Sequence, residues 1–238
     1  HIAGDGWSLN IILKEINHLC NVDNLSKLSV AKSLPLLDIQ YSDFACWQTD
    51  MLLDVSETEL AYWRKQLGVH GGPPALDLPY DRPRPKNQTF IGKNHLLEIT
   101  SELVVLLNEV CKREGVTLYM LLLVTFQLLL SRYSRQEDVC VGTPYAGRDQ
   151  TGTENLVGYF VNTLAMKSSI SNKNSVSTLM KDIKATVLSA FTNSNVPFHR
   201  VVDALNTVRD SSRSPVYQVM FILQDEVAMS EVFETTKD

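Results

Sequence analysis

Apolar residues recur every three to four positions in several stretches of the chain, and this spacing predicts amphipathic helices. In the first stretch, the apolar side chains at positions 9, 12, 13, 16 and 19 fall on one face. Further helices are expected at 41–48, 56–67, 101–113, 117–133, 176–191 and 197–205.

Residues that favour helix ends flank these stretches. Ser8 is a suitable N-cap for the first helix and Thr117 for the apolar helix at 117–133, whereas Gly115 is a suitable C-cap. Ser42 or Asp43 can cap the short helix at 41–48. Pro197 suits the first turn of the last helix, where its missing N–H costs nothing.

Short apolar runs predict strands at 89–99, 138–144, 156–166 and 216–223. The second is unbroken from Val139 to Val141, which favours burial on both faces. Because strands alternate with helices, we expect a layered α/β fold around a mostly buried sheet. The stretch from Gly68 to Gln88 is rich in glycine and proline, which oppose regular structure, so it is the predicted boundary between two lobes.

Composition narrows the classes of function. A net charge of −5 with scattered Lys and Arg disfavours nucleic-acid binding, and the apolar run at 118–130 is shorter than the roughly 20 residues of a membrane span. We therefore expect a cytoplasmic protein with neither nucleic-acid nor membrane partners. The chain starts without Met, inside a dense motif, so we expect a piece of a longer protein.

The cysteines are far apart and lack the spacing of a zinc site, so no metal is expected. We interpret them as small buried side chains of a protein that works in a reducing compartment. A disulfide between two of them is the alternative. They are Cys20, Cys46, Cys111 and Cys140.

The first eight residues concentrate reactive groups. His1 carries the imidazole usually chosen to move a proton near pH 7, and Asp5 is its orienter or an ion-pair partner. Gly4 and Gly6 argue for a tight loop before the helix, whose unpaired N–H groups can steady an oxyanion. The alternative is that His1 is merely terminal and Asp5 a helix cap.

Two later connections also suggest chemistry. Arg148 follows a buried strand and small residues, and its guanidinium can donate a bidentate pair of hydrogen bonds. Asn162 lies in an apolar strand and requires hydrogen-bond partners. The alternatives are a solvated surface arginine and an asparagine bonded to the backbone.

Five stretches together resemble the condensation domain of nonribosomal peptide synthetases. The second half of its H-H-x-x-x-D-G signature is matched by His1 to Gly6, and its Y-x-D-(F/Y)-A-x-W motif by Tyr41 to Gln48. Its (I/V)-G-x-F-V-N-T motif is similar to Val157–Thr163. The family's later motifs, built around V-P-F and R-x-P-(L/V)-F-Q-V-x-F, resemble Asn195–Arg200 and Arg213–Phe221.

The resemblance implies a two-layer α/β sandwich similar to chloramphenicol acetyltransferase, with two lobes and an active site in a tunnel between them. It assigns 1–68 to the C-terminal part of the N-terminal lobe and 69–88 to a proline-rich crossing between lobes. Residues 89–238 then form most of an incomplete C-terminal lobe. We expect a domain truncated at both ends and inactive by itself.

The implied reaction joins an upstream acyl or peptidyl thioester to the amine of a downstream aminoacyl thioester. Both substrates arrive on the 4'-phosphopantetheine arms of peptidyl carrier proteins, and the domain itself binds no cofactor. The upstream and downstream carrier proteins and the adjacent adenylation domain of the same synthetase are the implied partners. Such synthetases make antibiotics and other secondary metabolites.

The resemblance also assigns roles to residues. His1 deprotonates or holds the attacking amine, and Gly6 offers its N–H near the oxyanion. Asp5 is the structural member, paired with Arg148. Supporting positions are Trp7, Ser8 and Asn162.

Other functions stay open. One is a catalytically silent or epimerizing condensation-like module that recruits or modifies carrier-bound intermediates, and another is a stand-alone acyltransferase that uses a soluble acyl thioester. Trp7 directly before Ser8 favours condensation over epimerization. Heterocyclizing relatives carry Asp in place of His1, which disfavours that variant.

Overall fold

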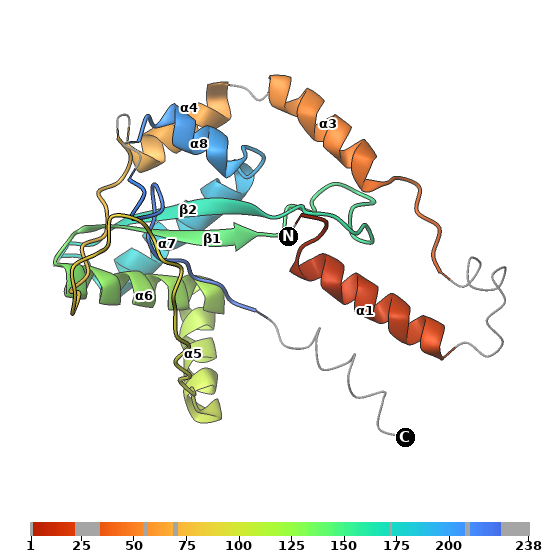
Figure 1. Ribbon diagram of the computed structural model, residues 1–238. Coiled ribbons are helices and arrows are strands. Elements are labelled where there is room, and N and C mark those ends of the chain that lie inside the picture. Colours follow the sequence, from red (N-terminus) through yellow and green to blue (C-terminus); the bar gives the residue numbers. More distant parts are fainter. Residues whose placement is uncertain are drawn as a thin grey trace. The chain divides into compact units, whose positions relative to one another are not determined.

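The computed structural model describes residues 2–21, 34–54, 57–68, 71–171, 173–207 and 210–224. Its elements, shown in Figure 1, are α1 (Gly6–Cys20), α3 (Tyr41–Asp54), α4 (Glu57–Leu67), α5 (Ser101–Glu114), α6 (Leu118–Ser134), β1 (Asp138–Tyr145), β2 (Asn162–Ser169), α7 (Val176–Thr192) and α8 (Phe198–Ala204).

Contacts divide the chain into two compact units. Unit 1 comprises His1–Val55, Tyr145–Asn162 and Leu223–Asp238, and unit 2 comprises Ser56–Pro144 and Thr163–Ile222. The predicted lobe boundary at 69–88 concerns the complete domain and stays a prediction. Within this chain, the described part of that segment belongs to unit 2 and has no regular structure, as its prolines and glycines predicted.

Unit 2 is built around a sheet of two strands, β1 and β2, which Figure 1 shows side by side. The N–H of Ile170, just after β2, donates to the carbonyl of Glu137, just before β1, so the strands run in opposite directions. Helix α6 packs against α5 and α7, and α4 packs against α8. Apolar side chains of the sheet and helices fill the core, among them Leu123, Val139, Val141, Leu164, Met166, Ile183 and Val187.

One polar side chain lies inside this core. Gln127 of α6 is fully buried, and its amide donates to the carbonyl of Met166 and accepts from the hydroxyl of Ser168. Both partners belong to β2, so the buried amide is satisfied and ties the helix to the sheet.

Several predicted helix ends are confirmed. Gly115 is the C-cap of α5 with φ 65°, and the side chain of Thr117 accepts from the N–H of Met120 at the start of α6. Pro197 precedes α8 as its N-cap, one position earlier than expected. Helix α3 is longer than the predicted 41–48 and continues to Asp54.

At the start of α1 the predicted cap, Ser8, is wrong, and the alternative of Asp5 as the helix cap is confirmed. The helix begins at Gly6, and its N-cap is Asp5, whose carboxylate accepts from the N–H of Ser8. Ser8 is therefore inside the first turn, and the glycines do not delay the helix. A first-turn N–H has no partner within the helix in any case, so a strong cap outweighs the small cost of glycine there.

Three strand predictions are wrong in whole or in part. Residues 89–99 form no strand, and at 216–223 only one bridge, between Gly142 and Met220, is found. Residues 156–161 are also irregular, so β2 begins only at Asn162. A strand requires a neighbour for its N–H and C=O groups, and residues 89–99 instead leave apolar side chains such as Phe90 and Leu96 exposed.

Cysteine burial is also only partly as expected. Cys111 and Cys140 are buried, whereas Cys20 and Cys46 are exposed, and all of them are free thiols. Taken singly, none of the helices in the described ranges is long and apolar enough to cross a membrane. Helices α5 and α6 meet that requirement only as a pair, and they are bent by 100° at the break between them.

Candidate active site

Asp5 is the centre of a buried polar cluster in unit 1. Its Oδ1 accepts from the backbone N–H of Ser8 at 2.8 Å and from Nη2 of Arg148 at 3.1 Å. Its Oδ2 accepts from the backbone N–H of Phe160 at 3.1 Å. The carboxylate is therefore both the N-cap of α1 and the point at which the segment between β1 and β2 meets that helix. In Figure 1 this segment, coloured green to teal, lies beside the start of α1.

The Arg148 guanidinium completes the cluster. Its Nη2 also donates to the Ser8 hydroxyl at 3.0 Å, while Nη1 donates to the carbonyls of Thr153 at 2.6 Å and Leu156 at 2.8 Å. The side chain is only 3% exposed. Four bonds from one planar group fix both the loop that carries Arg148 and the residues at the start of α1.

Aromatic rings cover the same guanidinium. Its central carbon lies 4.0 Å from the centre of the Phe160 ring and 5.7 Å from that of Trp7. Among the described residues, the Nε of Arg148 has no hydrogen-bond partner although it is buried. The rings compensate in part for the water lost, because a cation is attracted to an aromatic face.

Ser8 joins the two charged groups through its hydroxyl. The oxygen accepts from Arg148 and from the backbone N–H of Gly158 at 3.0 Å, and it lies 2.7 Å from both Asp5 Oδ1 and the Gly158 carbonyl. A hydroxyl has one proton, so it donates to only one of these two acceptors at a time. With Ser8 almost fully buried, every polar bond it makes stays inside the protein.

The environment keeps Asp5 ionised. Burial by itself raises the pKa of the Asp5 carboxyl, but the bonds from the Ser8 N–H, the Ser8 hydroxyl and the Phe160 N–H, together with the charge of Arg148, outweigh burial. The net result is a pKa below the ordinary value. Asp5 is therefore an anchor that accepts hydrogen bonds and is poorly suited to act as an acid at neutral pH.

Two glycines permit this packing. Gly147 has φ 66°, and a Cβ there would overlap the Phe160 carbonyl. A Cβ at Gly158 would overlap the ring of Tyr41. The backbone therefore approaches its neighbours at these positions more closely than any larger residue allows.

The structure brings together most of the residues that the sequence singled out. Asp5, Ser8, Arg148 and Trp7 form one cluster, and the expected Asp5–Arg148 ion pair is present at 3.1 Å. Gly6 is exposed as the first residue of α1, and a Cβ there would meet nothing within 4 Å.

Asn162 is the partly buried first residue of β2. His1 lies outside the described residues.

Several members of the cluster were not predicted from the sequence, because they take part through backbone groups. The N–H groups of Gly158 and Phe160 and the carbonyls of Thr153 and Leu156 take part, and a main-chain group leaves no mark in the residue type. The available signal was the motif at 157–163, whose apolar pattern predicts a strand instead.

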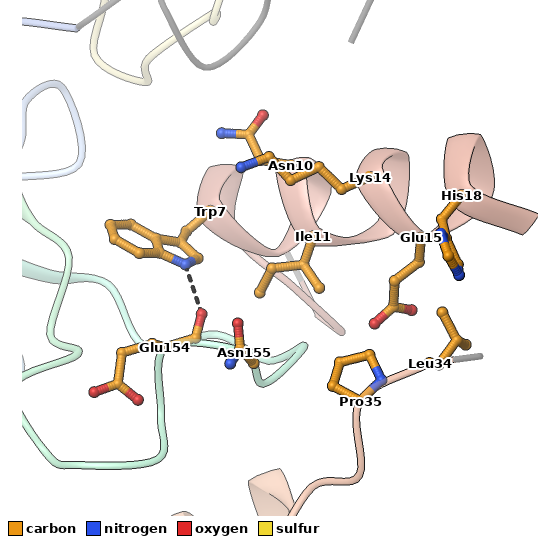
Figure 2. Close-up of a pocket in the computed structure, with 10 residues that line it drawn as sticks. All are labelled: Trp7, Asn10, Ile11, Lys14, Glu15, His18, Leu34, Pro35, Glu154 and Asn155. Carbon is orange, nitrogen blue, oxygen red and sulfur yellow. Dashed lines mark hydrogen bonds between the residues drawn. The ribbon is translucent and has the colours of Figure 1, made fainter. Parts of the chain in front are cut away.

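A cavity of about 640 Å³ lies next to this cluster in unit 1. In Figure 2 the Trp7 indole points towards Glu154, and its Nε1 donates to the Glu154 carbonyl at 2.9 Å. The cavity has apolar, neutral polar and ionisable side chains in its lining, which consists of Trp7, Asn10, Ile11, Lys14, Glu15, His18, Leu34, Pro35, Glu154 and Asn155. Within the described ranges, no group of His, Cys, Asp or Glu side chains is arranged to hold a metal ion.

Comparison with known proteins now decides the family, because a family model described as Condensation domain matches residues 1–238. The chain belongs to the condensation domain family. One of the linear gramicidin synthase proteins of Brevibacillus parabrevis is 42% identical over 234 residues, which are 97% of this chain and 4% of that protein. Gramicidin S synthase 2 of Brevibacillus brevis is 40% identical over 226 residues, which are 94% of this chain and 5% of that protein. The chain therefore spans only a small part of these much longer relatives.

Solved structures agree on the fold. The X-domain from teicoplanin biosynthesis has a TM-score of 0.80 at 23% identity, covering 92% of this chain and 49% of its own. The four-domain nonribosomal peptide synthetase AB3403, bound to AMP and glycine, has a TM-score of 0.75 at 22% identity, covering 96% of this chain and 17% of its own. The predicted α/β fold class of the condensation domain is thus confirmed, and the chain spans about half of the X-domain.

Proposed function

We propose that this chain is part of a condensation domain that forms amide bonds in a nonribosomal peptide synthetase. The single observation that carries the proposal, beside family membership, is the Asp5 anchor. A buried carboxylate with an arginine, a serine and two backbone segments around it fixes the start of α1. That start lies five positions after the imidazole-bearing His1 in the sequence.

The helix start suits the developing charge of acyl transfer. Gly6 is the first residue of α1, where N–H groups have no partner within the helix and the helix dipole is positive. Such groups stabilise an oxyanion when they point at it. The exposed position of Gly6, with open space around it among the described residues, is consistent with this role.

The proposed reaction needs no protein nucleophile. The amine nitrogen of the acceptor attacks the thioester carbonyl of the donor, and the carbonyl oxygen becomes the oxyanion. Collapse of that intermediate re-forms C=O and breaks the C–S bond, and the proton lost by nitrogen is balanced by the proton gained by the departing thiolate. Holding the activated donor thioester and the acceptor amine in position supplies much of the rate, with His1 accepting the proton from the amine or holding the amine by a hydrogen bond.

In this proposal the remaining residues support the site. Asp5, Ser8 and Arg148 hold the start of α1, Trp7 covers the guanidinium, and Asn162 lies at the start of β2. Both substrates arrive on the 4'-phosphopantetheine arms of upstream and downstream peptidyl carrier proteins. The adjacent adenylation domain of the same synthetase is a further partner in this proposal.

The test uses the complete condensation domain with its two loaded carrier proteins. Wild type, His1→Ala and His95→Ala are compared, and the carrier-bound product is followed by intact-protein mass spectrometry. His95 is a control because it is an exposed histidine of unit 2 that belongs neither to the Asp5 cluster nor to the lining of its cavity. We expect joined product from wild type and His95→Ala, with a loss of about 100-fold or more in His1→Ala.

Two results would each overturn one part of the proposal, the reaction or the role of His1. Absence of product from wild type across several donor and acceptor pairs would remove the condensation reaction. Equal product from wild type and His1→Ala would retain the reaction and remove His1 from the chemistry. We also expect the 238-residue chain by itself to form no product, and turnover by it would contradict that expectation.

A further inference from the structure

The aromatic motif at 41–48 contacts residues of the Asp5 cluster. Tyr41 is the first residue of α3, and its hydroxyl donates to the carbonyl of Tyr159 at 2.9 Å. Its ring meets that of Phe160 edge-on, with centres 5.2 Å apart. The same ring occupies the space beside Gly158 that a Cβ would need. One tyrosine therefore contacts three consecutive residues.

Two of those three residues, Gly158 and Phe160, hold the anchor in place. The N–H of Gly158 donates to the Ser8 hydroxyl and its carbonyl lies within bonding distance of the same hydroxyl, while the Phe160 N–H donates to Asp5. The Phe160 ring also lies against the Arg148 guanidinium. Any shift of the segment 158–160 would move these groups relative to the carboxylate.

Tyr41 itself is firmly placed. The Asp43 carboxylate accepts from the backbone N–H of Gln40 at 2.8 Å, an arrangement that secures the first turn of α3. Phe44, one turn along the helix, is buried, and its ring centre lies 4.5 Å from that of Phe160. The start of α3 is thus fixed both by its own cap and by an aromatic contact.

We infer that Tyr41 is a positioning residue for amide formation, acting through the segment 158–160 to hold Asp5, Ser8 and Arg148 in their working geometry. The inference rests on the proposed function for its catalytic part, whereas the hold on Asp5 is a property of the fold. Tyr41 need not contact either substrate, so its loss should lower kcat and leave KM for both carrier proteins unchanged.

The first experiment removes only the hydroxyl. In the complete condensation domain, Tyr41→Phe is compared with wild type and with Tyr80→Phe, a control tyrosine in unit 2 whose hydroxyl accepts from Arg84. We expect Tyr41→Phe to lower kcat about two- to fivefold, the range for one partly exposed hydrogen bond, with KM unchanged. Tyr80→Phe should match wild type.

The second readout does not require turnover. Carboxyl ¹³C NMR follows the titration of Asp5 in the same proteins. Because the Phe160 N–H helps hold the pKa of Asp5 below its ordinary value, loosening the segment in Tyr41→Phe should raise that pKa towards the ordinary range. A tyrosine that merely fills space would leave the titration unchanged.

A double-mutant cycle tests the route through Gly158. Gly158→Ala should lower kcat about tenfold or more, because its methyl group displaces the Tyr41 ring. Tyr41→Ala frees that space, so the double variant should lose much less than the product of the two single losses. Independent, multiplicative losses would contradict the proposed route.

The outcomes separate the two proposals. If Tyr41→Phe matches wild type in both kcat and the Asp5 titration, or raises KM with kcat unchanged, the inference is overturned. If wild type makes no product while the Asp5 titration still moves in Tyr41→Phe, the condensation function fails and the hold of Tyr41 on Asp5 stands.

Discussion

The two units of the chain are organised around opposite kinds of centre. Unit 2 surrounds its sheet with apolar side chains, several of them fully buried, such as Leu123, Leu164 and Val187. Unit 1 surrounds a buried ion pair with backbone and hydroxyl groups, and its apolar cluster consists of Phe44, Leu156 and Phe160, with Ile39 packed against it. In unit 2 the core is defined by how apolar side chains fill space, whereas in unit 1 the centre is defined by the directions of its hydrogen bonds.

This difference gives the two units different roles, because one kind of centre mainly supplies stability and the other mainly fixes the positions of side chains. Apolar burial is non-directional and contributes free energy roughly in proportion to area, so unit 2 is suited to supply stability. A buried ion pair loses much of its attraction to the cost of removing both charges from water, but it fixes where each partner lies. The Asp5 cluster is therefore best understood as a device that sets positions in unit 1.

The largest expected effect is from breaking the ion pair. Arg148→Ala leaves the Asp5 carboxylate buried without its cation and leaves the Thr153 and Leu156 carbonyls without their donor. We expect the free energy of unfolding of the complete domain to fall by about 3–5 kcal/mol, measured by urea denaturation. Arg113→Ala, at an arginine that is 71% exposed, is the control and should change it by less than about 0.5 kcal/mol. A loss below about 1 kcal/mol in Arg148→Ala would mean that water replaces the guanidinium freely.

A slightly smaller effect is expected in the apolar core. Leu164 of β2 is fully buried, so Leu164→Ala should lower the free energy of unfolding by about 2–5 kcal/mol through lost burial and the cavity left behind. The exposed Leu188 on α7 provides the control, for which Leu188→Ala should cost less than about 1 kcal/mol. Similar losses from both leucines would show that the core of unit 2 is not closely packed.

The smallest effect, and the sharpest distinction between the units, is the response to acid. The folded-state pKa of Asp5 is below its unfolded value of about 4, so its contribution to stability is present above that pH and is lost as the pH falls through the folded value. The stability gap between wild type and Asp5→Asn should therefore shrink as the pH is lowered from about 7 to about 3.

The apolar variant supplies the comparison for that titration. The gap between wild type and Leu164→Ala should stay constant over the same pH range, because no titrating group is involved. A gap for Asp5→Asn that also stays constant would mean that the Asp5 pKa is the same in the folded and unfolded states.

The sequence determined the elements whose causes are local. The helices 101–113 and 117–133 were predicted within a few residues because Thr117 and Gly115 act on their own neighbours, and the strand at 138–144 was predicted from its unbroken apolar run. The sequence also indicated which residues of the candidate site matter. Asp5, Ser8 and Arg148 were singled out from residue type and position, motif resemblance implied the Asp5–Arg148 pair, and all three meet in one cluster.

The hydrogen-bond partners of several backbone groups depend on the tertiary fold and cannot be inferred from local sequence. The segment 156–161 is apolar enough for a strand, yet its Gly158 and Phe160 N–H groups bond to side chains at the start of α1, 150 and 155 positions away in the sequence. Residues 89–99 likewise have strand-like side chains but no neighbouring strand among the described residues. The contacts of Tyr41 with Tyr159 and Phe160 also join segments that are far apart in the sequence. Side-chain pattern is a property of the chain, whereas hydrogen-bond partners across such distances exist only once the chain has folded.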